Sequence, residues 1–237
     1  MTILSFLTTH DFQPFLSLEQ QTDVMFISAN KAATAVFVYF LYLFMYHEPN
    51  AVWALSEISI VNTLLPIPII FVIYDFFYTL LHWFLHIQSI YGYIHKHHHR
   101  QKAPSRANMD AINVHPLEFF LGEYNHLFAL FLYTSVLGMK CHIACLGIVL
   151  VIGAVLAGLN HTRFDVTMKL FGGSLNLYDS KWHDVHHRIP QSNYGQYTVI
   201  WDKIFGTFRE YNPDDRVNPK SQLDPSTGKS IEYKKTR

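Results

Sequence analysis

The chain has 237 residues, of which 50% are hydrophobic, 16% aromatic and 15% charged. This composition excludes an intrinsically disordered chain, which is rich in charge and poor in aromatic residues, and the length suits a single domain. Lys and Arg (18 residues) balance Asp and Glu (18 residues), so no net charge attracts DNA or RNA, and nucleic acid is not expected as a partner.

Four apolar runs predict an all-α integral membrane bundle of about four spans. They cover residues 32–46, 58–81, 127–139 and 141–160. A bilayer core needs about 20 apolar residues in a helix, so the second and fourth runs are long enough and the other two are short. Pro66 and Pro68 predict a kink or break in the second run. Cys141 and Cys145 lie in the fourth and are expected to be buried thiols.

A soluble bundle with buried helices is the alternative, but four such runs leave little polar surface to cover them. Basic residues gather in segments 95–106 and 163–188, whereas Lys140 is the only one in the turns that join the paired runs. The positive-inside rule therefore places residues 82–126 and 161–237 in the cytosol. We expect an N-terminal segment (1–31), a membrane catalytic domain (32–210) and a polar cytosolic tail (211–237).

Histidines recur three times at spacings of three or four residues, which place each set on one side of a helix. The sets are His82 and His86; His95, His98 and His99; and His183, His186 and His187. Buried unpaired imidazoles are costly, and protonated ones repel each other, whereas a divalent cation binds the neutral nitrogens. Eight nitrogens exceed the three or four ligands of one ion, so the sets predict two metals. The alternative is a pH-sensitive histidine-rich surface.

The metal is less narrowly defined, because imidazole binds Zn, Cu, Fe and Ni. No Cys or Met accompanies the sets, which argues against copper(I) and iron–sulfur chemistry, and no His-Glu-x-x-His pattern supports a zinc protease. A non-haem di-iron oxygenase or another zinc site remains. A metal transporter is a third reading, but it would place histidines inside the spans, where only His142 lies.

These motifs resemble the fatty acid hydroxylase superfamily, which includes sterol desaturases, sterol methyl oxidases, sphingoid base hydroxylases and fatty acid 2-hydroxylases. The family's boxes, His-x-x-x-His and two copies of His-x-x-His-His, match residues 82–86, 95–99 and 183–187. The resemblance covers about residues 70–210. It implies a multi-pass protein of the endoplasmic reticulum with a cytosolic helical histidine-rich cap, two iron ions, O2 as co-substrate and electrons from cytochrome b5.

The resemblance also indicates four residues outside the boxes. Several relatives have a further histidine where this chain has His161, so His161 is expected to bind metal. Asp165, four residues later, is a candidate to orient or supplement it, or to pair with Arg163 or cap a helix. Asp75 lies within an apolar run, where carboxylates are usually functional, and is expected to hydrogen-bond a metal-binding histidine. His115, in a family-like His-Pro-Leu-Glu stretch, is expected just outside the ligand set.

The expected reaction is hydroxylation of a lipid: a sterol, a sphingoid base or a fatty acyl chain, with a modest lean toward the first two. Desaturation within the same family is the alternative. The chain holds no recognisable haem or flavin segment, so the donor is a separate protein, cytochrome b5 or another NAD(P)H-linked donor. Zinc could replace iron in the purified protein. The final residues 234–237 (Lys-Lys-Thr-Arg) resemble a dilysine retrieval signal of the endoplasmic reticulum.

Overall fold

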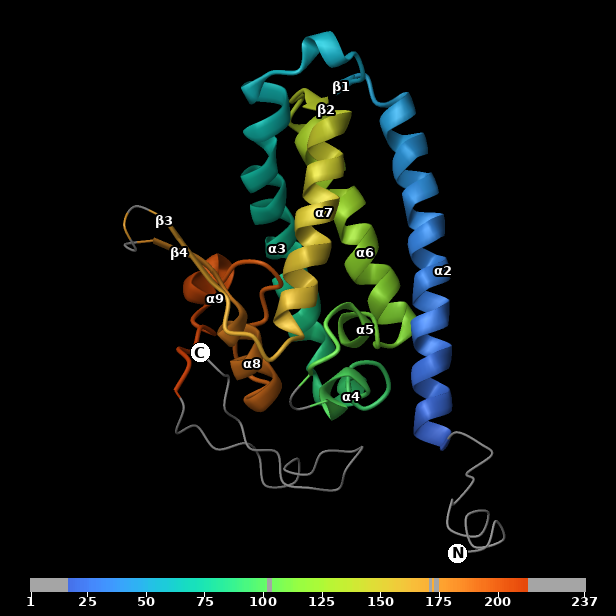
Figure 1. Cartoon of the computed structure of the whole chain (residues 1–237), viewed down its shortest axis with the longest axis vertical. Helices are drawn as coiled ribbons and strands as arrows, with labels where there is room; N and C mark the ends of the chain where they lie inside the picture. The colour runs from blue at the N-terminus through green and yellow to red at the C-terminus, as the bar shows by residue number, and fades with distance from the viewer. Residues whose placement is uncertain (1–16, 102–103, 171, 173–174, 213–237) are drawn as a thin grey trace, which may run out of the picture.

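The computed structural model describes residues 17–101, 104–170, 172 and 175–212. Four long helices run side by side and alternate in direction (Figure 1): α2 (Leu18–His47), α3 (Pro66–Leu85), α6 (Pro116–Phe131) and α7 (Ile143–Asn160). Because the number of long helices is even, both ends of the described chain lie at the same end of the bundle (Figure 1). Short elements and connecting segments gather at that end, which we call the cap.

Sequence signals at the helix starts explain where these helices begin. Ser17 and Gln20 form a reciprocal capping box at the start of α2. Pro66 is the first residue of α3 and Pro116 that of α6, a position where the missing N–H of proline costs nothing. The His142 side chain accepts a hydrogen bond from Ala144 N at the start of α7.

The end of the bundle opposite the cap is closed by short elements. These are β1 (Ala51–Val52), the 3-10 helix η1 (Leu55–Glu57), the π-helices η2 (Ile60–Leu64) and η4 (Leu132–Val136), and β2 (Cys141–His142). β1 and β2 pair in parallel, with Ala51 opposite Cys141. The helix changes from π to α between Leu64 and Pro66, where the two prolines predict a break.

The cap consists of further short elements. They are α4 (Gln88–Tyr91), the 3-10 helix η3 (His98–Arg100), α5 (Asn108–Ala111), β3 (Thr167–Leu170), β4 (Leu175–Asp179), α8 (Ser180–Arg188) and α9 (Ile200–Phe205). β3 and β4 form an antiparallel hairpin that the sequence did not predict. The cap is therefore less helical than expected: residues 95–97 form turns before η3, not the start of one continuous helix.

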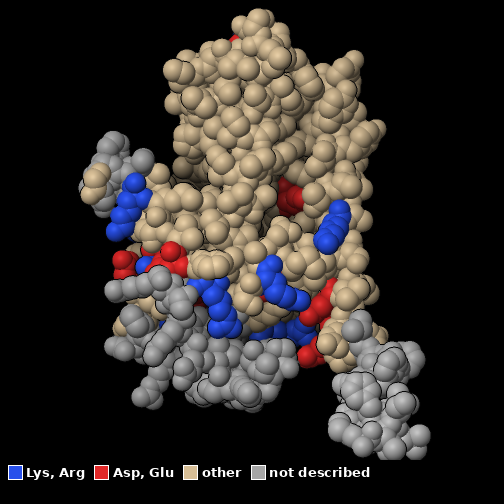
Figure 2. All heavy atoms as spheres, in the orientation of Figure 1, with Lys and Arg blue, Asp and Glu red and all other residues tan. Residues whose placement is uncertain are grey.

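The surface of the bundle agrees with a membrane protein. Three of the described helical stretches are long and apolar enough to cross a bilayer: Leu18–His47, Ile60–Leu85 and Ile143–Asn160. The fourth long helix, α6, has 16 residues and is extended by η4. In Figure 2 the charged side chains lie mainly over the cap half, and most of the opposite half is free of charge. The prediction of a helical membrane bundle of about four spans with a histidine-rich cap is confirmed.

The core of the bundle joins all four long helices. Phe37 and Leu41 of α2 and Ile70 of α3 belong to one buried cluster that also includes Cys141 and Cys145, both free thiols as predicted. α2 begins well before the expected apolar run, so the proposed boundary at residues 31 and 32 falls inside a helix. The tail beyond residue 212, including the dilysine-like end, lies outside the described residues.

Candidate metal centre

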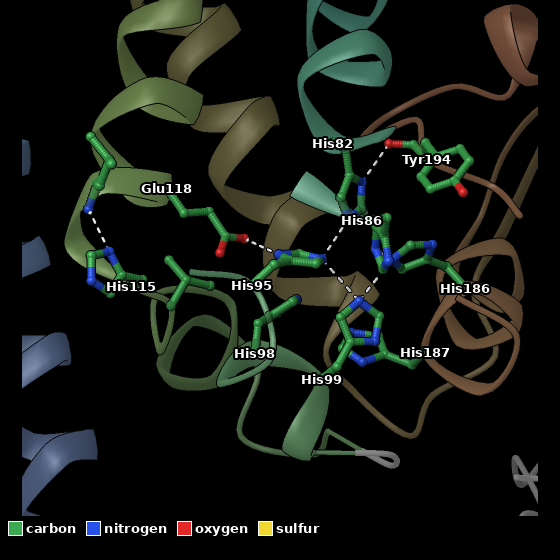
Figure 3. Close-up of polar contacts among 12 residues, drawn as sticks. His82, His86, His95, His98, His99, His115, Glu118, His186, His187 and Tyr194 are labelled. Carbon is green, nitrogen blue, oxygen red and sulfur yellow. Dashed lines mark hydrogen bonds and ion pairs between the residues drawn. The ribbon is translucent and has the colours of Figure 1, made fainter. Parts of the chain in front are cut away.

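Nine histidines form two groups in the cap, and they are the nine that the sequence predicts as metal ligands. The first group consists of His82, His86, His95, His99 and His186, and the second of His98, His161, His183 and His187. Within each group the candidate ligand atoms all lie within 4.8 Å of one another, and every ring except that of His86 is buried. Figure 3 shows rings of the first group turned toward a common centre.

The first group joins three segments of the chain. His82 lies in the last turn of α3, and His86 is the residue that ends this helix. The Nε2 atom of His95 lies 3.0 Å from that of His82 and 2.9 Å from that of His99. From α8, the Nε2 atom of His186 lies 3.0 Å from that of His99 and 3.3 Å from that of His86. The five ring nitrogens thus converge.

The second group is built beside the first. His161 ends α7, and its Nε2 atom lies 3.3 Å from that of His98 in η3. His183 and His187 stand one turn apart on α8. The Nε2 atom of His183 lies 3.2 Å from that of His161 and 3.1 Å from that of His187. Four nitrogens therefore face one point.

Each three-histidine box divides between the two groups, contrary to the expectation that its rings share one side of a helix. In α8, His186 joins the first group, whereas His183 and His187 join the second. Successive residues of an α-helix are about 100° apart, so the rings of His186 and His187 diverge and α8 stands between the groups. The second box divides in the opposite sense: His98 joins the second group, and its two neighbours in the box join the first.

Backbone carbonyls hold the outward nitrogen of several rings. A carbonyl oxygen can only accept, so these rings carry their proton on Nδ1 and turn the lone pair of Nε2 toward the group. The acceptors are Tyr194 O for His82 at 2.7 Å, Ser192 O for His186 at 2.7 Å and Ala157 O for His161 at 2.8 Å. Figure 3 shows the first of these contacts.

This donor set fits metal ions. Neutral imidazole lone pairs that face each other repel, and a cation between them removes the repulsion. Two nitrogens that each lie about 2.1 Å from an ion are about 3.0 Å apart at a right angle and about 3.4 Å apart at the tetrahedral angle. The contacts between Nε2 atoms, 2.9–3.3 Å, fall close to this range. Five ligands in the first group exceed the four of a tetrahedral zinc site.

Glu118 of α6 holds His95, a role that the sequence did not assign. Its Oε1 atom lies 2.7 Å from Nδ1 of His95 (Figure 3), and both side chains are buried. A carboxylate that accepts from the outer nitrogen fixes the ring and makes the inner nitrogen more basic. The sequence feature that could have indicated this role is the family-like His-Pro-Leu-Glu stretch, whose glutamate is Glu118.

Replacement of Glu118 by Gln is expected to weaken metal binding by the first group about 10-fold to 100-fold, the usual effect of losing such a partner. The amide keeps the shape and one acceptor but loses the charge. Metal titration of the stripped protein checks this, with occupancy of the second group as the internal control. Equal loss from both groups, or from neither, contradicts the role.

Two buried carboxylates hold the loop that carries Tyr194. Asp202 accepts hydrogen bonds from Tyr194 N at 2.8 Å and Gly195 N at 2.9 Å. Asp75 accepts from Tyr197 N at 3.1 Å and from the N–H groups of the residues on either side. Five consecutive N–H groups therefore point to carboxylates, and the first residue of this loop positions His82. A Cβ atom at Gly195 would lie 2.1 Å from a backbone oxygen, so no other residue fits there.

The structure corrects the expected contact of Asp75. Within the described part of the chain its hydrogen bonds go to the loop at residues 196–198, not to a histidine. Asp75 therefore acts on His82 only through the backbone. The reason is the spacing along α3: Asp75 lies two turns before His82, and the loop at residues 194–198 hydrogen-bonds both side chains.

The two other candidates outside the boxes, His115 and Asp165, also have partners other than a histidine of either group. His115 caps α6: its Nδ1 atom accepts from Leu117 N at 3.2 Å, and it belongs to neither histidine group. Asp165 forms an ion pair with Lys181, at 3.2 Å, and also belongs to neither group. The chain leaves the helix at His161, so Asp165 does not share a helical face with it.

Burial favours the neutral form of four histidines of the cap. The pKa of each of these rings lies well below 6.5. Desolvation is the larger cause, and repulsion from neighbouring rings is the smaller one. The four residues are His98, His99, His186 and His187. Below pH 6.5 the unfolded chain therefore binds more protons than the folded chain.

The metal-free protein is expected to lose stability as the pH falls below about 6.5, since each such histidine contributes up to about 1.4 kcal/mol per pH unit. Thermal unfolding between pH 8 and pH 5 measures this. The His187→Asn variant should show a shallower loss, and a melting temperature that does not change with pH would contradict the expectation.

A cavity of about 360 Å³ reaches the second group. His98 and His161 lie at its cap end, and residues of α2, α3, α6 and α7 form its walls. Most of the lining side chains are apolar or aromatic. The volume lies within the range of small-molecule sites. A lipid-sized ligand in this cavity would therefore reach the histidines from within the bundle.

The model of the family named Fatty acid hydroxylase matches residues 67–207, which hold all nine histidines. The chain belongs to the fatty acid hydroxylase family. No solved structure matches it significantly.

Named relatives of this family member act on sterols and sphingoid bases. A lathosterol oxidase of Rattus norvegicus is 29% identical over 153 residues, 63% of this chain and 48% of that protein. A methylsterol monooxygenase 1 of Gallus gallus is 30% identical, over 64% of this chain and 49% of the relative. A sphinganine C4-monooxygenase 2 of Arabidopsis thaliana is 27% identical, over 58% and 52%. The chain spans about half the length of these relatives.

Proposed function

We propose that this protein is a membrane-bound oxidoreductase that uses two iron ions and O2 to hydroxylate a lipid. The observation that carries the proposal is the cavity between the four long helices, which reaches His98 and His161. The names of the relatives support lipid oxidation. The two histidine groups support a pair of metal ions.

The residues of the chain have separable tasks in this reaction. The nine histidines would hold the two ions, which supply the oxidant for an unactivated C–H bond. The carbonyls of Tyr194, Ser192 and Ala157 hold the rings in one tautomer. Burial of the groups excludes water that would compete for the oxidant.

The cavity brings the lipid to the site from the bilayer. Its walls include Phe37 of α2, Tyr74 and Tyr78 of α3, and Leu150 of α7, which offer apolar and aromatic surface to a hydrocarbon chain or ring system. The protein needs only to place the reacting carbon at the cap end. The lipid need not leave the membrane phase.

Desaturation is a second candidate, because one relative, from Nicotiana tabacum, is named a delta(7)-sterol-C5(6)-desaturase and is 27% identical over 163 residues. Removal of a second hydrogen in place of oxygen insertion gives an alkene. The histidine groups serve both outcomes.

We further propose that the protein lies in the endoplasmic reticulum membrane with its cap in the cytosol. The concentration of charged side chains over the cap and the basic residues of this end support the orientation (Figure 2). A cytosolic cap gives a separate donor, cytochrome b5 or another NAD(P)H-linked protein, access to the metal site. The His-rich cap lies at one end of the bundle, unlike the central path that a metal transporter requires.

Metal analysis and turnover test the proposal together. Anaerobically purified protein should contain two iron ions per chain, and with a reduced donor it should form an oxygenated or unsaturated product from a lipid panel only in the presence of O2. One ion per chain, or product formation without O2, contradicts the proposal. Metal flux into proteoliposomes would support the transporter.

A further inference from the structure

Two carboxyl side chains face the cavity, and the described residues of its wall include no Lys or Arg to pair with them. They are Glu118 and Glu123, both on α6. Its remaining titratable groups include His98, His126 and His161, of which two belong to the second histidine group. A head group that enters therefore meets carboxyl oxygens that can accept hydrogen bonds, and it meets no Lys or Arg among the described lining residues.

Glu123, in the wall of the cavity, has one carboxyl oxygen without a hydrogen-bond partner. Its Oε2 atom is buried and has no hydrogen-bond partner, and Thr34 of α2 contacts the carboxylate from the opposite wall. An unsatisfied buried acceptor costs free energy until a donor reaches it.

Two other polar side chains of the cavity wall, His126 and Tyr74, have hydrogen-bond partners. Nε2 of His126 lies 3.0 Å from the hydroxyl of Tyr197, and the hydroxyl of Tyr74 donates to Gly122 O at 3.2 Å. The Oε1 atom of Glu118 contacts His95, and its Oε2 atom, like that of Glu123, has no hydrogen-bond partner. Of the two carboxyl groups that line the cavity, Glu118 contacts a histidine of the metal site, whereas Glu123 does not.

Helix geometry places Glu123 above the site. Gly153 of α7 lies level with His126, since a Cβ atom there would be 3.7 Å from its ring. His161 is eight residues further along α7, and Glu123 is three residues before His126 on the antiparallel α6. At 1.5 Å rise per residue, Glu123 stands about 8 Å from the level of His161.

We propose that Glu123 binds the head group of a lipid that carries a free hydroxyl or amino group, and that the cavity rejects lipids with a carboxylate. The inference rests on the proposed function for the fate of the lipid, but the binding itself does not require turnover.

Equilibrium binding to the metal-loaded protein in phosphatidylcholine nanodiscs tests this. The probes are octadecanol, octadecylamine, octadecyl methyl ether and stearate, together with cholestanol and its methyl ether. On at least one of the two scaffolds, the octadecyl chain and the sterol, we expect the hydroxyl form to bind at least 10-fold more tightly than its methyl ether. We also expect stearate to bind more weakly than octadecanol. The octadecanol and octadecylamine arms distinguish a hydroxyl from an amino head group.

Two variants separate charge from hydrogen bonding. Glu123→Leu should abolish the preference for the hydroxyl over the ether, and Glu123→Gln should weaken octadecylamine binding and strengthen stearate binding. Glu57→Gln, on an exposed side chain of η1, is the matched control and should match the parent protein.

Equal binding of alcohol and ether on both scaffolds overturns the proposal, as does stearate binding as tight as that of octadecanol. Because these are binding constants, a protein that selects lipid alcohols but forms no product would refute the oxidoreductase proposal and leave this one standing.

Discussion

The His99→Ala variant is expected to lose the metal of the first group and more than about 100-fold of the activity, beyond the usual loss for a partner outside the ligand set. The Nε2 atom of His99 lies 2.9 Å from that of His95 and 3.0 Å from that of His186, so His99 stands between two other candidate ligands. Metal counting by mass spectrometry and product formation with the active lipid measure both effects.

The control is a ligand of the other group. His187→Ala should lose the metal of the second group, so each variant should retain about one ion per chain. His115 belongs to neither group, and His115→Ala removes only the side chain at the N-terminus of α6, so this variant should retain both ions. If His99→Ala and His187→Ala remove the same ion, the division into two groups is wrong.

The Asp75→Ala variant is expected to lower the free energy of unfolding by several kcal/mol and to reduce occupancy of the first group. Three backbone N–H groups lose their acceptor, at about 1–3 kcal/mol for each that stays buried and unsatisfied. The loop that they belong to carries the carbonyl that holds His82. Denaturation in detergent and metal titration measure the two effects.

Two variants make this result specific. Asp75→Asn keeps one acceptor oxygen and should recover part of both losses. Asp165→Ala removes a partly exposed ion pair with Lys181 and should cost less than about 1 kcal/mol. A loss of metal in Asp165→Ala as large as that in Asp75→Ala would favour the alternative, drawn from the sequence, that Asp165 orients or supplements His161.

The length of α2 shows why some of the fold escaped prediction. Its apolar run begins at residue 32, but the helix starts at Leu18 because its polar first half packs against the cap. Asn30 donates to Ile112 O at 2.8 Å and Val114 O at 2.9 Å, and Asp23 pairs with Arg100 at 2.7 Å. Such contacts join segments about 80 residues apart, and no local pattern reports them.

The sequence by itself determined the apolar helices and eight of the nine histidines, because both follow from the spacing of neighbouring residues, and the family resemblance added His161. Only the tertiary structure decided how those histidines are shared. His186 meets His86 across 100 residues of chain, whereas His187, its neighbour, turns to the other group. It also made Asp75 the anchor of a loop 121 or more residues away. Helical periodicity sets the direction of a side chain, but the partner that it meets depends on how the elements pack.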